Sequence, residues 1–185
     1  FASSYIYGDP EYLPIDEIHP ISAFNPYCQS KIIGEQLCES YHKDFGVPVM
    51  IFRPFNIYGP GQNKDFLIPS IKRQIEEDNQ VQLNDPRPKR DFIHVLDVVH
   101  AYKLALEYKK SDFEIFNLGS GKSHSAKEVA EIMISEFSKD VILEFTGDQR
   151  ENEVLDTIAD ITKAQKKMGW KPSISINDGV SLLMR

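Results

Sequence analysis

Cysteine is scarce in the chain: Cys28 and Cys38 are the only two among 185 residues. Both fall in one expected helix, about three turns apart, which is too far for a disulfide within that helix. This favours a reducing compartment. No apolar run approaches the roughly 20 residues that span a bilayer, and no basic segment followed by an apolar one marks a signal peptide. We therefore expect a cytoplasmic protein that does not contact membranes.

Positive charge is also in deficit. The 21 Lys and Arg residues face 28 Asp and Glu residues, which gives a net charge of −7, and the basic residues are scattered along the chain. This distribution argues against binding of nucleic acid or of an anionic membrane. It leaves room for a small anionic ligand held by two or three arginines. Hydrophobic residues make up 41% and charged residues 26%, as is typical of globular proteins.

The motifs of several enzyme classes are missing. The five histidines are dispersed without metal-ligand spacing, so we expect no metal site. No G-x-S-x-G nucleophile elbow of a hydrolase occurs. Gly121-Lys122-Ser123 resembles the end of a P-loop, but the glycine required five positions before Gly121 is Phe116. We interpret this segment as a structural turn.

A Gly-rich turn of the form G-x-x-G-x-x-G, which holds the pyrophosphate of a dinucleotide, is absent as well. The chain begins with Phe1 rather than with methionine, and residues 1–4 are typical of the end of a buried strand. We expect the chain to be the C-terminal part of a longer protein.

Strands and helices are expected to alternate along the chain, which predicts an α/β fold with a parallel sheet. The clearest element is a helix over residues 26–45, with Asn25 as its N-cap and Gly46 as its stop. Its apolar residues Ile33, Leu37 and Tyr41 recur at steps of four. The other expected strands are 49–52, 81–83, 115–118 and 141–145, with 91–94 extended; the other expected helices are 68–77, 97–108, 125–137 and a last clear one capped by Asp160 and stopped by Gly169, and 56–62 is expected to be a turn.

Tyr27 and Lys31 are the first candidates for chemistry. They lie four positions apart in the expected helix, so their side chains share one face. A free phenol is almost entirely un-ionised at neutral pH, and an adjacent ammonium stabilises the phenolate that a general base requires. On spacing alone, the commoner interpretation is a half-buried tyrosine beside a solvated lysine.

Further motifs accompany this pair along the chain. In order, they are Ser3–Pro10, Asn25–Lys31, Arg53–Gly61, Arg90–Val95, Asn117–Gly121 and Gly169–Pro172. This series resembles the extended short-chain dehydrogenase/reductase family of NAD-dependent nucleotide-sugar epimerases and dehydratases. The resemblance implies a partial NAD(P)-binding Rossmann fold with a smaller C-terminal α/β substrate-binding lobe. Residues 1–60 would form the end of the dinucleotide-binding domain, and residues 61–185 mainly the substrate lobe, with segments returning to the sheet.

The resemblance also implies roles for individual residues. Ser3, Tyr27 and Lys31 correspond to the catalytic triad: Tyr27 is the base for the sugar hydroxyl, Lys31 supports the phenolate and binds the nicotinamide ribose, and Ser3 hydrogen-bonds the reacting oxygen. The implied cofactor is NAD rather than NADP, and the implied substrate is a nucleotide-diphosphate sugar. The remaining implied contacts are Pro54 and Phe55 at the nicotinamide, and Ser4, Asn56, Arg90 and Arg150 at the substrate.

The chain departs from the family pattern at Ser4 and Tyr5, where the 4,6-dehydratases carry Asp and Glu, so we expect a 4-epimerase or a 4-ketosugar reductase. A 4,6-dehydratase and a non-catalytic sugar-nucleotide-binding remnant stay open as alternatives. Pro86 and Asn152 replace usual glycines, and Asn152 weakens the assignment of Arg150. Relatives commonly dimerise through the Tyr-x-x-x-Lys helix and the helix before it, of which we expect only the first in this sequence. This implies a homodimer for the intact protein.

Overall fold

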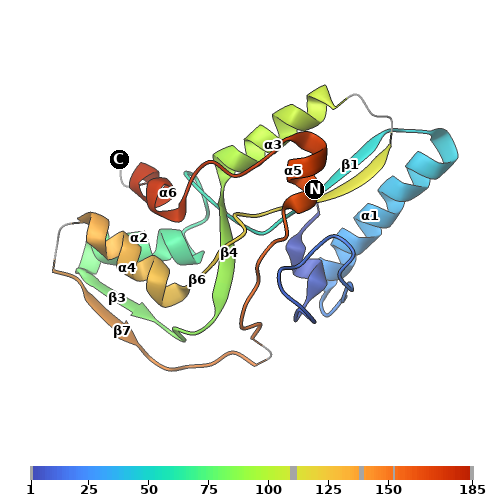
Figure 1. Cartoon of the computed structure of the whole chain (residues 1–185). Helices are drawn as coiled ribbons and strands as arrows, with labels where there is room; N and C mark the ends of the chain where they lie inside the picture. The colour runs from blue at the N-terminus through green and yellow to red at the C-terminus, as the bar shows by residue number, and fades with distance from the viewer. Residues whose placement is uncertain (1, 109–111, 138–139, 152, 184–185) are drawn as a thin grey trace.

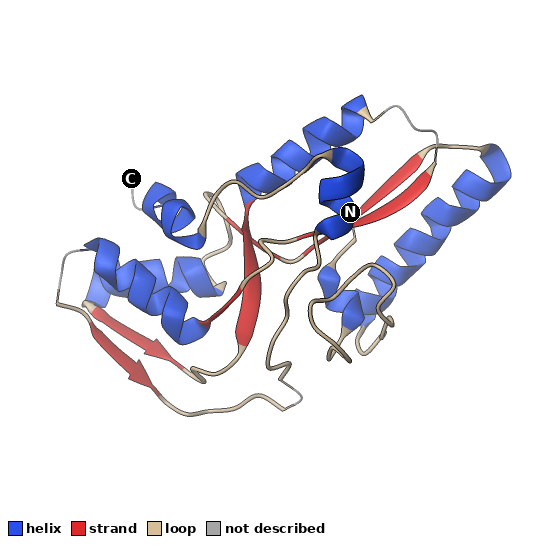
Figure 2. Ribbon diagram, viewed as in Figure 1, coloured by secondary structure: helices blue, strands red, loops and turns tan. Residues whose placement is uncertain are grey.

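The structure is a computed structural model that describes residues 2–108, 112–137, 140–151 and 153–183. The expectations for Phe1 and Asn152 lie outside the described residues. Helices and strands alternate along the chain, which confirms the α/β class (Figure 2). The elements are a 3₁₀ turn η1 (Ser4–Tyr7), helices α1 (Pro26–Phe45), α2 (Leu67–Asp78), α3 (Val95–Glu107), α4 (Ala126–Phe137), α5 (Thr162–Met168) and α6 (Ile176–Leu183), and strands β1 (Val49–Pro54), β2 (Asn56–Tyr58), β3 (Gln80–Leu83), β4 (Lys89–His94), β5 (Phe113–Leu118), β6 (Ser123–Ser125) and β7 (Ile142–Phe145).

Most strand pairs are parallel and join segments that lie far apart in the sequence. β1 pairs with β5, β2 with β4, and β3 with β7, all in parallel, whereas β4 pairs antiparallel with β6. Parallel pairing requires crossover connections, which here contain helices. Because β1 and β2 follow one another directly while pairing with different strands, the segment 49–58 links the two ends of the molecule (Figure 1).

The two larger apolar cores of the described residues lie on the two sides of β4. Helices α2, α4 and α6 pack together beside β3 and β7 at one end, and α1, α3 and α5 surround the β1–β5 pair at the other (Figure 1). Burial of apolar area in each core is the main stabilising term. The first core contains Tyr58, Ile68, Ile71, Ile75, Val81, Val129, Met133 and Val180, and the second contains Phe52, Ile93, Val98, Phe116, Leu118 and Trp170.

Helix α1 has the caps that its sequence predicts. The Asn25 side chain accepts a hydrogen bond from the Cys28 amide at 2.8 Å, and Gly46 ends the helix in the left-handed conformation. The helix is fixed to β1 by Glu35, whose carboxylate receives two hydrogen bonds from the buried Arg53 guanidinium, at 2.6 and 2.9 Å. The apolar residues at steps of four are not buried against the sheet: Ile33, Leu37 and Tyr41 are 53%, 58% and 52% exposed.

Five details of the expected secondary structure are wrong. The described residues of the expected first strand are not a strand: Ala2 donates a backbone hydrogen bond to Phe52, and η1 begins at Ser4. The expected turn 56–62 begins with strand β2, which pairs with β4. The helix before Gly169 has Ile161 rather than Asp160 as its N-cap, although Asp160 receives a hydrogen bond from the Thr162 amide. The short elements β6 and α6 were not expected.

Within the described residues, no helix has both the length and the apolar character needed to cross a membrane.

Candidate active site

The Tyr27–Lys31 pair lies in the first two turns of α1. Helical spacing brings Lys31 Nζ to 5.3 Å from the centroid of the Tyr27 ring. Tyr27 is 51% exposed, so its phenol can meet a ligand. The structure thus confirms that the two side chains lie together, as helical spacing predicts, whereas their roles as base and supporting cation stay predictions.

Ser3 is connected to the Tyr27–Lys31 pair indirectly, through Tyr5. The Ser3 hydroxyl oxygen accepts a hydrogen bond from the Tyr5 amide at 3.2 Å, so its own proton is available for another acceptor. The Tyr5 carbonyl receives hydrogen bonds from Cys28 Sγ and from the Gly8 amide, both at 3.3 Å. The Tyr5 ring stands edge-on to the Tyr27 ring, with centroids 6.3 Å apart. No hydrogen bond joins Ser3 directly to Tyr27 among the residues described.

Pro54 is the last residue of β1, and Phe55 and Asn56 follow it at the carboxyl end of this strand, where parallel α/β sheets bind ligands. Phe55 is 4% exposed, and its side chain packs in a small core with Tyr7 and Ile15. Asn56 is partly exposed and donates a hydrogen bond to the Asp91 carbonyl at 3.3 Å. Their contacts with cofactor and substrate stay predictions.

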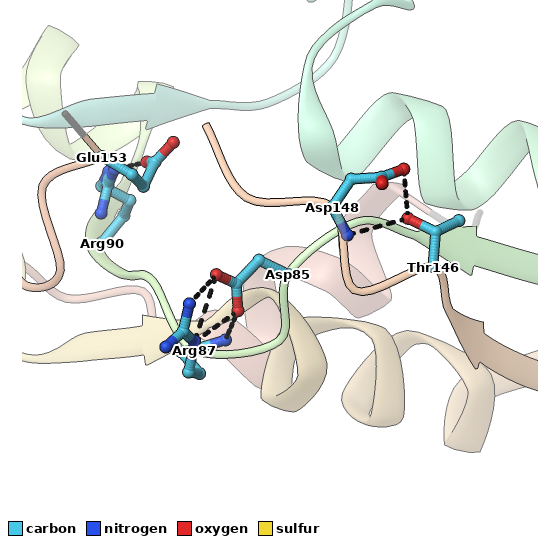
Figure 3. A network of polar contacts seen from close by, with 6 residues as sticks. All are labelled: Asp85, Arg87, Arg90, Thr146, Asp148 and Glu153. Atoms are coloured by element: carbon cyan, nitrogen blue, oxygen red, sulfur yellow. Dashed lines mark hydrogen bonds and ion pairs between the residues drawn. The ribbon is translucent and has the colours of Figure 1, made fainter. Parts of the chain in front are cut away.

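Arg90 projects from β4 toward the segment that follows β7. Its guanidinium forms an ion pair with Glu153 and donates a hydrogen bond to the Val154 carbonyl at 2.7 Å (Figure 3). Arg150 belongs to the same segment, but it is exposed and has no hydrogen bond or ion pair within the described part of the chain. The structure therefore does not bring the two candidate arginines into one contact.

Asp91 has a structural role beside this site that the sequence reasoning missed. It lies in the part of β4 that is buried on both faces, and its own side chain is fully buried. Its carboxylate accepts hydrogen bonds from the Ser120 amide and hydroxyl, the Gly121 amide and the Ala159 amide, at 2.6, 2.7, 3.0 and 3.1 Å. Burial raises the pKa of Asp91, and these four donors oppose the rise. The motif Arg90–Val95 contains the acceptor Asp91, and the motif Asn117–Gly121 contains the donors Ser120 and Gly121. The sequence thus contained both motifs but did not show that they meet.

A second polar network links η1 to the strands β1 and β5. Tyr7 donates a hydrogen bond to the Asn117 side chain at 2.7 Å and accepts one from Arg53 at 3.0 Å. Burial raises the pKa of Tyr7 to about 12, so this phenol stays protonated. The network explains why Tyr7 serves as a fixed support, whereas the exposed Tyr27 is the candidate base.

No group of histidine, cysteine, aspartate or glutamate side chains suited to a metal ion occurs within the described residues. His94 is buried as the N-cap of α3, where its Nδ1 accepts a hydrogen bond from the Leu96 amide at 3.3 Å. Burial lowers the pKa of His94. Its place is that of a helix cap within the core.

Comparison with known families assigns the chain to a class. Residues 1–183 match the family described as GDP-mannose 4,6 dehydratase. The chain belongs to this family, within the extended short-chain dehydrogenases/reductases of nucleotide-sugar epimerases and dehydratases.

Individual relatives agree with this assignment. The chain is 36% identical over 191 residues to a Methanocaldococcus jannaschii protein that carries the name of a UDP-glucose 4-epimerase, covering 97% of this chain and 59% of the relative. Other relatives include a GDP-6-deoxy-D-mannose reductase, and the solved structures include an NDP-hexosamine 5,6-dehydratase. The chain spans about 60% of the length of the curated relatives that it matches.

Solved structures confirm the Rossmann-type α/β fold. RMD from Pseudomonas aeruginosa, complexed with NADPH, superposes with a TM-score of 0.90 at 28% identity, covering 99% of this chain and 63% of the other. UDP-glucuronic acid 4-epimerase from Bacillus cereus, in complex with UDP-glucuronic acid and NAD, gives 0.87 at 30% identity, covering 98% and 58%. Both of these neighbours are complexes with a nicotinamide cofactor.

Proposed function

We propose that this chain carries the catalytic and sugar-nucleotide side of an NAD-dependent 4-epimerase acting on a nucleotide-diphosphate sugar. The observation that carries the proposal is the exposed Tyr27 phenol with Lys31 Nζ 5.3 Å from its ring centroid. The pair fits a nicotinamide cofactor, because the ammonium can donate to ribose hydroxyls while the phenol faces the sugar. When bound, the nicotinamide supplies a hydride acceptor and donor.

The chain's own residues handle the proton. Tyr27, as phenolate, takes the proton of the sugar 4-hydroxyl and later returns it to the 4-keto oxygen. Lys31 stabilises the phenolate by its charge. Ser3 donates its free hydroxyl proton to the reacting oxygen, since its oxygen already accepts from the Tyr5 amide. Inversion at C4 would require a hydride to return to the opposite face of the 4-keto carbon, chemistry that the nicotinamide would supply, while Tyr27 handles only the proton on oxygen.

Substrate binding is assigned to the region beyond the carboxyl end of β1. Asn56 begins β2, Arg90 lies near the start of the neighbouring strand β4, and Arg150 lies on the exposed segment beyond β7. A guanidinium donates parallel hydrogen bonds that match phosphate oxygens, so Arg90 and Arg150 suit a diphosphate. Ser4 lies beside Ser3 and is assigned to the sugar.

Dehydration is disfavoured by the residues next to Ser3. Removal of water from the sugar requires an acid and a base besides the triad, and Ser4 and Tyr5 carry no carboxylate. The Tyr5 ring instead contacts Tyr27 and Phe24.

The exposed apolar residues of α1 support a proposed homodimer of the intact protein. Ile33, Leu37 and Tyr41 form a stripe at steps of four, and each is more than half exposed. A stripe of this kind is costly to leave in water and is typical of an interface between helices. The domain boundary near residue 60 also stays a proposal.

Replacing Tyr27 by Phe in the full-length protein tests the function. We expect kcat for interconversion of UDP-glucose and UDP-galactose to fall by roughly a thousandfold or more with little change in KM, because only the transition state loses the base. Tyr41→Phe, an exposed tyrosine of the same helix, is the matched control. NMR of the products should show a C4 epimer; retained turnover in Tyr27→Phe, or loss of water from the hexose, would refute the assignment.

A further inference from the structure

The segment after β7 crosses over the connection between β3 and β4 and is bonded to it at both ends. We call residues 146–151 and 153–155 the crossing segment. At its start, the Thr146 amide donates to the Leu83 carbonyl at 2.9 Å. At its end, the Leu155 carbonyl accepts from the Lys89 amide at 2.8 Å. These backbone bonds hold Glu153 within reach of β4.

Arg90 is occupied by this segment in the structure. Its Nη2 is paired with Glu153, and its Nη1 donates to the carbonyls of Val154 and Lys89 at 2.7 and 2.8 Å. The side chains of Arg90 and Glu153 are each 20% exposed, so the pair is partly shielded from water but open to a ligand. The guanidinium is thus accessible, and its best charge partner is a carboxylate of the same chain.

We propose that Glu153 is a specificity-determining residue: it competes with the ligand diphosphate for Arg90 and so selects ligands that carry more negative charge than one carboxylate. This inference rests on the proposed function, which assigns Arg90 to the diphosphate. A diphosphate has two charged groups and can replace Glu153 with a gain in charge-assisted hydrogen bonds. A ligand with a single weak charge would bind Arg90 no more strongly than the Glu153 carboxylate that it displaces.

The exchange requires only side-chain movement. The backbone bonds at Thr146 and Leu155 do not involve the Glu153 carboxylate, so they persist when it rotates away. The hydrogen bonds from Arg90 to Val154 and Lys89 likewise use Nη1 and leave Nη2 free for the ligand. Arg90 therefore stays positioned while its charge partner changes.

A matched control lies in the same connection. Asp85 and Arg87 form a second pair, with Arg87 Nη2 2.7 Å from Asp85 Oδ2, next to the Arg90–Glu153 pair (Figure 3). Asp85→Asn and Glu153→Gln each remove one negative charge from this region. Only Glu153→Gln frees Arg90.

The test measures binding of inorganic pyrophosphate and of UDP to the full-length protein by titration calorimetry. Glu153→Gln should bind both roughly three- to tenfold more tightly than the wild type, the effect of losing one partly shielded ion pair. Asp85→Asn should stay within about twofold. In steady-state kinetics, Glu153→Gln should lower KM for the nucleotide sugar and leave kcat unchanged.

Three outcomes would overturn the inference: weaker binding in Glu153→Gln, unchanged binding, or equal tightening in Asp85→Asn. If Glu153→Gln does not fold, Glu153→Asp takes its place, because a shorter carboxylate loosens the pair and should tighten binding in the same direction. Pyrophosphate contains no base or sugar, so tightening by Glu153→Gln in a protein without nucleotide-sugar turnover would support the role of Glu153 while refuting the proposed reaction.

Discussion

The substitution Asp91→Asn gives the sharpest test of how the site is held in place. Asp91 is fully buried, and its two oxygens accept four hydrogen bonds from two other segments of the chain, so that three segments meet at this carboxylate. Asn has the same shape, so any effect comes from hydrogen bonding and charge. One of its terminal atoms is an NH₂ group, which donates and cannot accept.

The cost follows from the geometry. The Asn oxygen can keep both bonds to Ser120, which share Asp91 Oδ1. The NH₂ group then faces the Gly121 and Ala159 amides, which both donate to Oδ2. Two buried donors lose their acceptor at about 1–3 kcal/mol each, so we expect a loss of about 2–6 kcal/mol in the free energy of unfolding. That is a large part of the stability of a typical domain.

Urea unfolding followed by circular dichroism measures this loss. Two further variants calibrate it: Ser120→Ala removes one of the four donors to Asp91 together with the exposed hydroxyl contacts to Lys122, and Asp148→Asn makes the same chemical change at an exposed position. Ser120→Ala should cost clearly less than Asp91→Asn, and Asp148→Asn less than either. A loss below about 1 kcal/mol in Asp91→Asn would show that this carboxylate does not hold the three segments together.

Local signals in the sequence predicted the helix that carries the candidate base. Asn25 and Gly46 fix the ends of α1 through contacts within a few residues, and the Tyr27–Lys31 contact follows from helical spacing alone. The start of the helix expected over 125–137 is also set by local contacts, because Ser125 and Glu128 form a capping box with reciprocal hydrogen bonds of 2.7 and 3.1 Å.

Contacts between distant segments could not be predicted in this way. Arg90 and Glu153 lie 63 positions apart, and their pairing depends on the path of the crossing segment over the β3–β4 connection. The strand β2 has only three residues, and it forms because β4 supplies its partner. The burial of Phe55 likewise depends on Tyr7 and Ile15, which come from the N-terminal region. Sequence patterns locate such residues but not their partners.

Two further predictions concern stability. Burial opposes ionisation of Glu114, but hydrogen bonds from two lysines of α5 outweigh it and lower its pKa, so its stabilising effect is present at neutral pH and is lost as pH falls through the lowered pKa. Urea midpoints between about pH 6 and pH 3 should therefore fall less in Glu114→Gln than in the wild type, and parallel curves would contradict this. Gly179→Ala should destabilise the protein by about 1–3 kcal/mol, because the added Cβ would lie 2.0 Å from the Tyr58 hydroxyl oxygen, and Tyr58 is almost fully buried and cannot move aside without disturbing the core. Gly34→Ala, a helix position with nothing within 4 Å, should instead be neutral or stabilising by up to about 1 kcal/mol. In thermal melts, the melting temperature of Gly179→Ala should therefore be clearly lower than that of Gly34→Ala. Equal melting temperatures would show that α6 does not pack on Tyr58 as closely as the geometry requires.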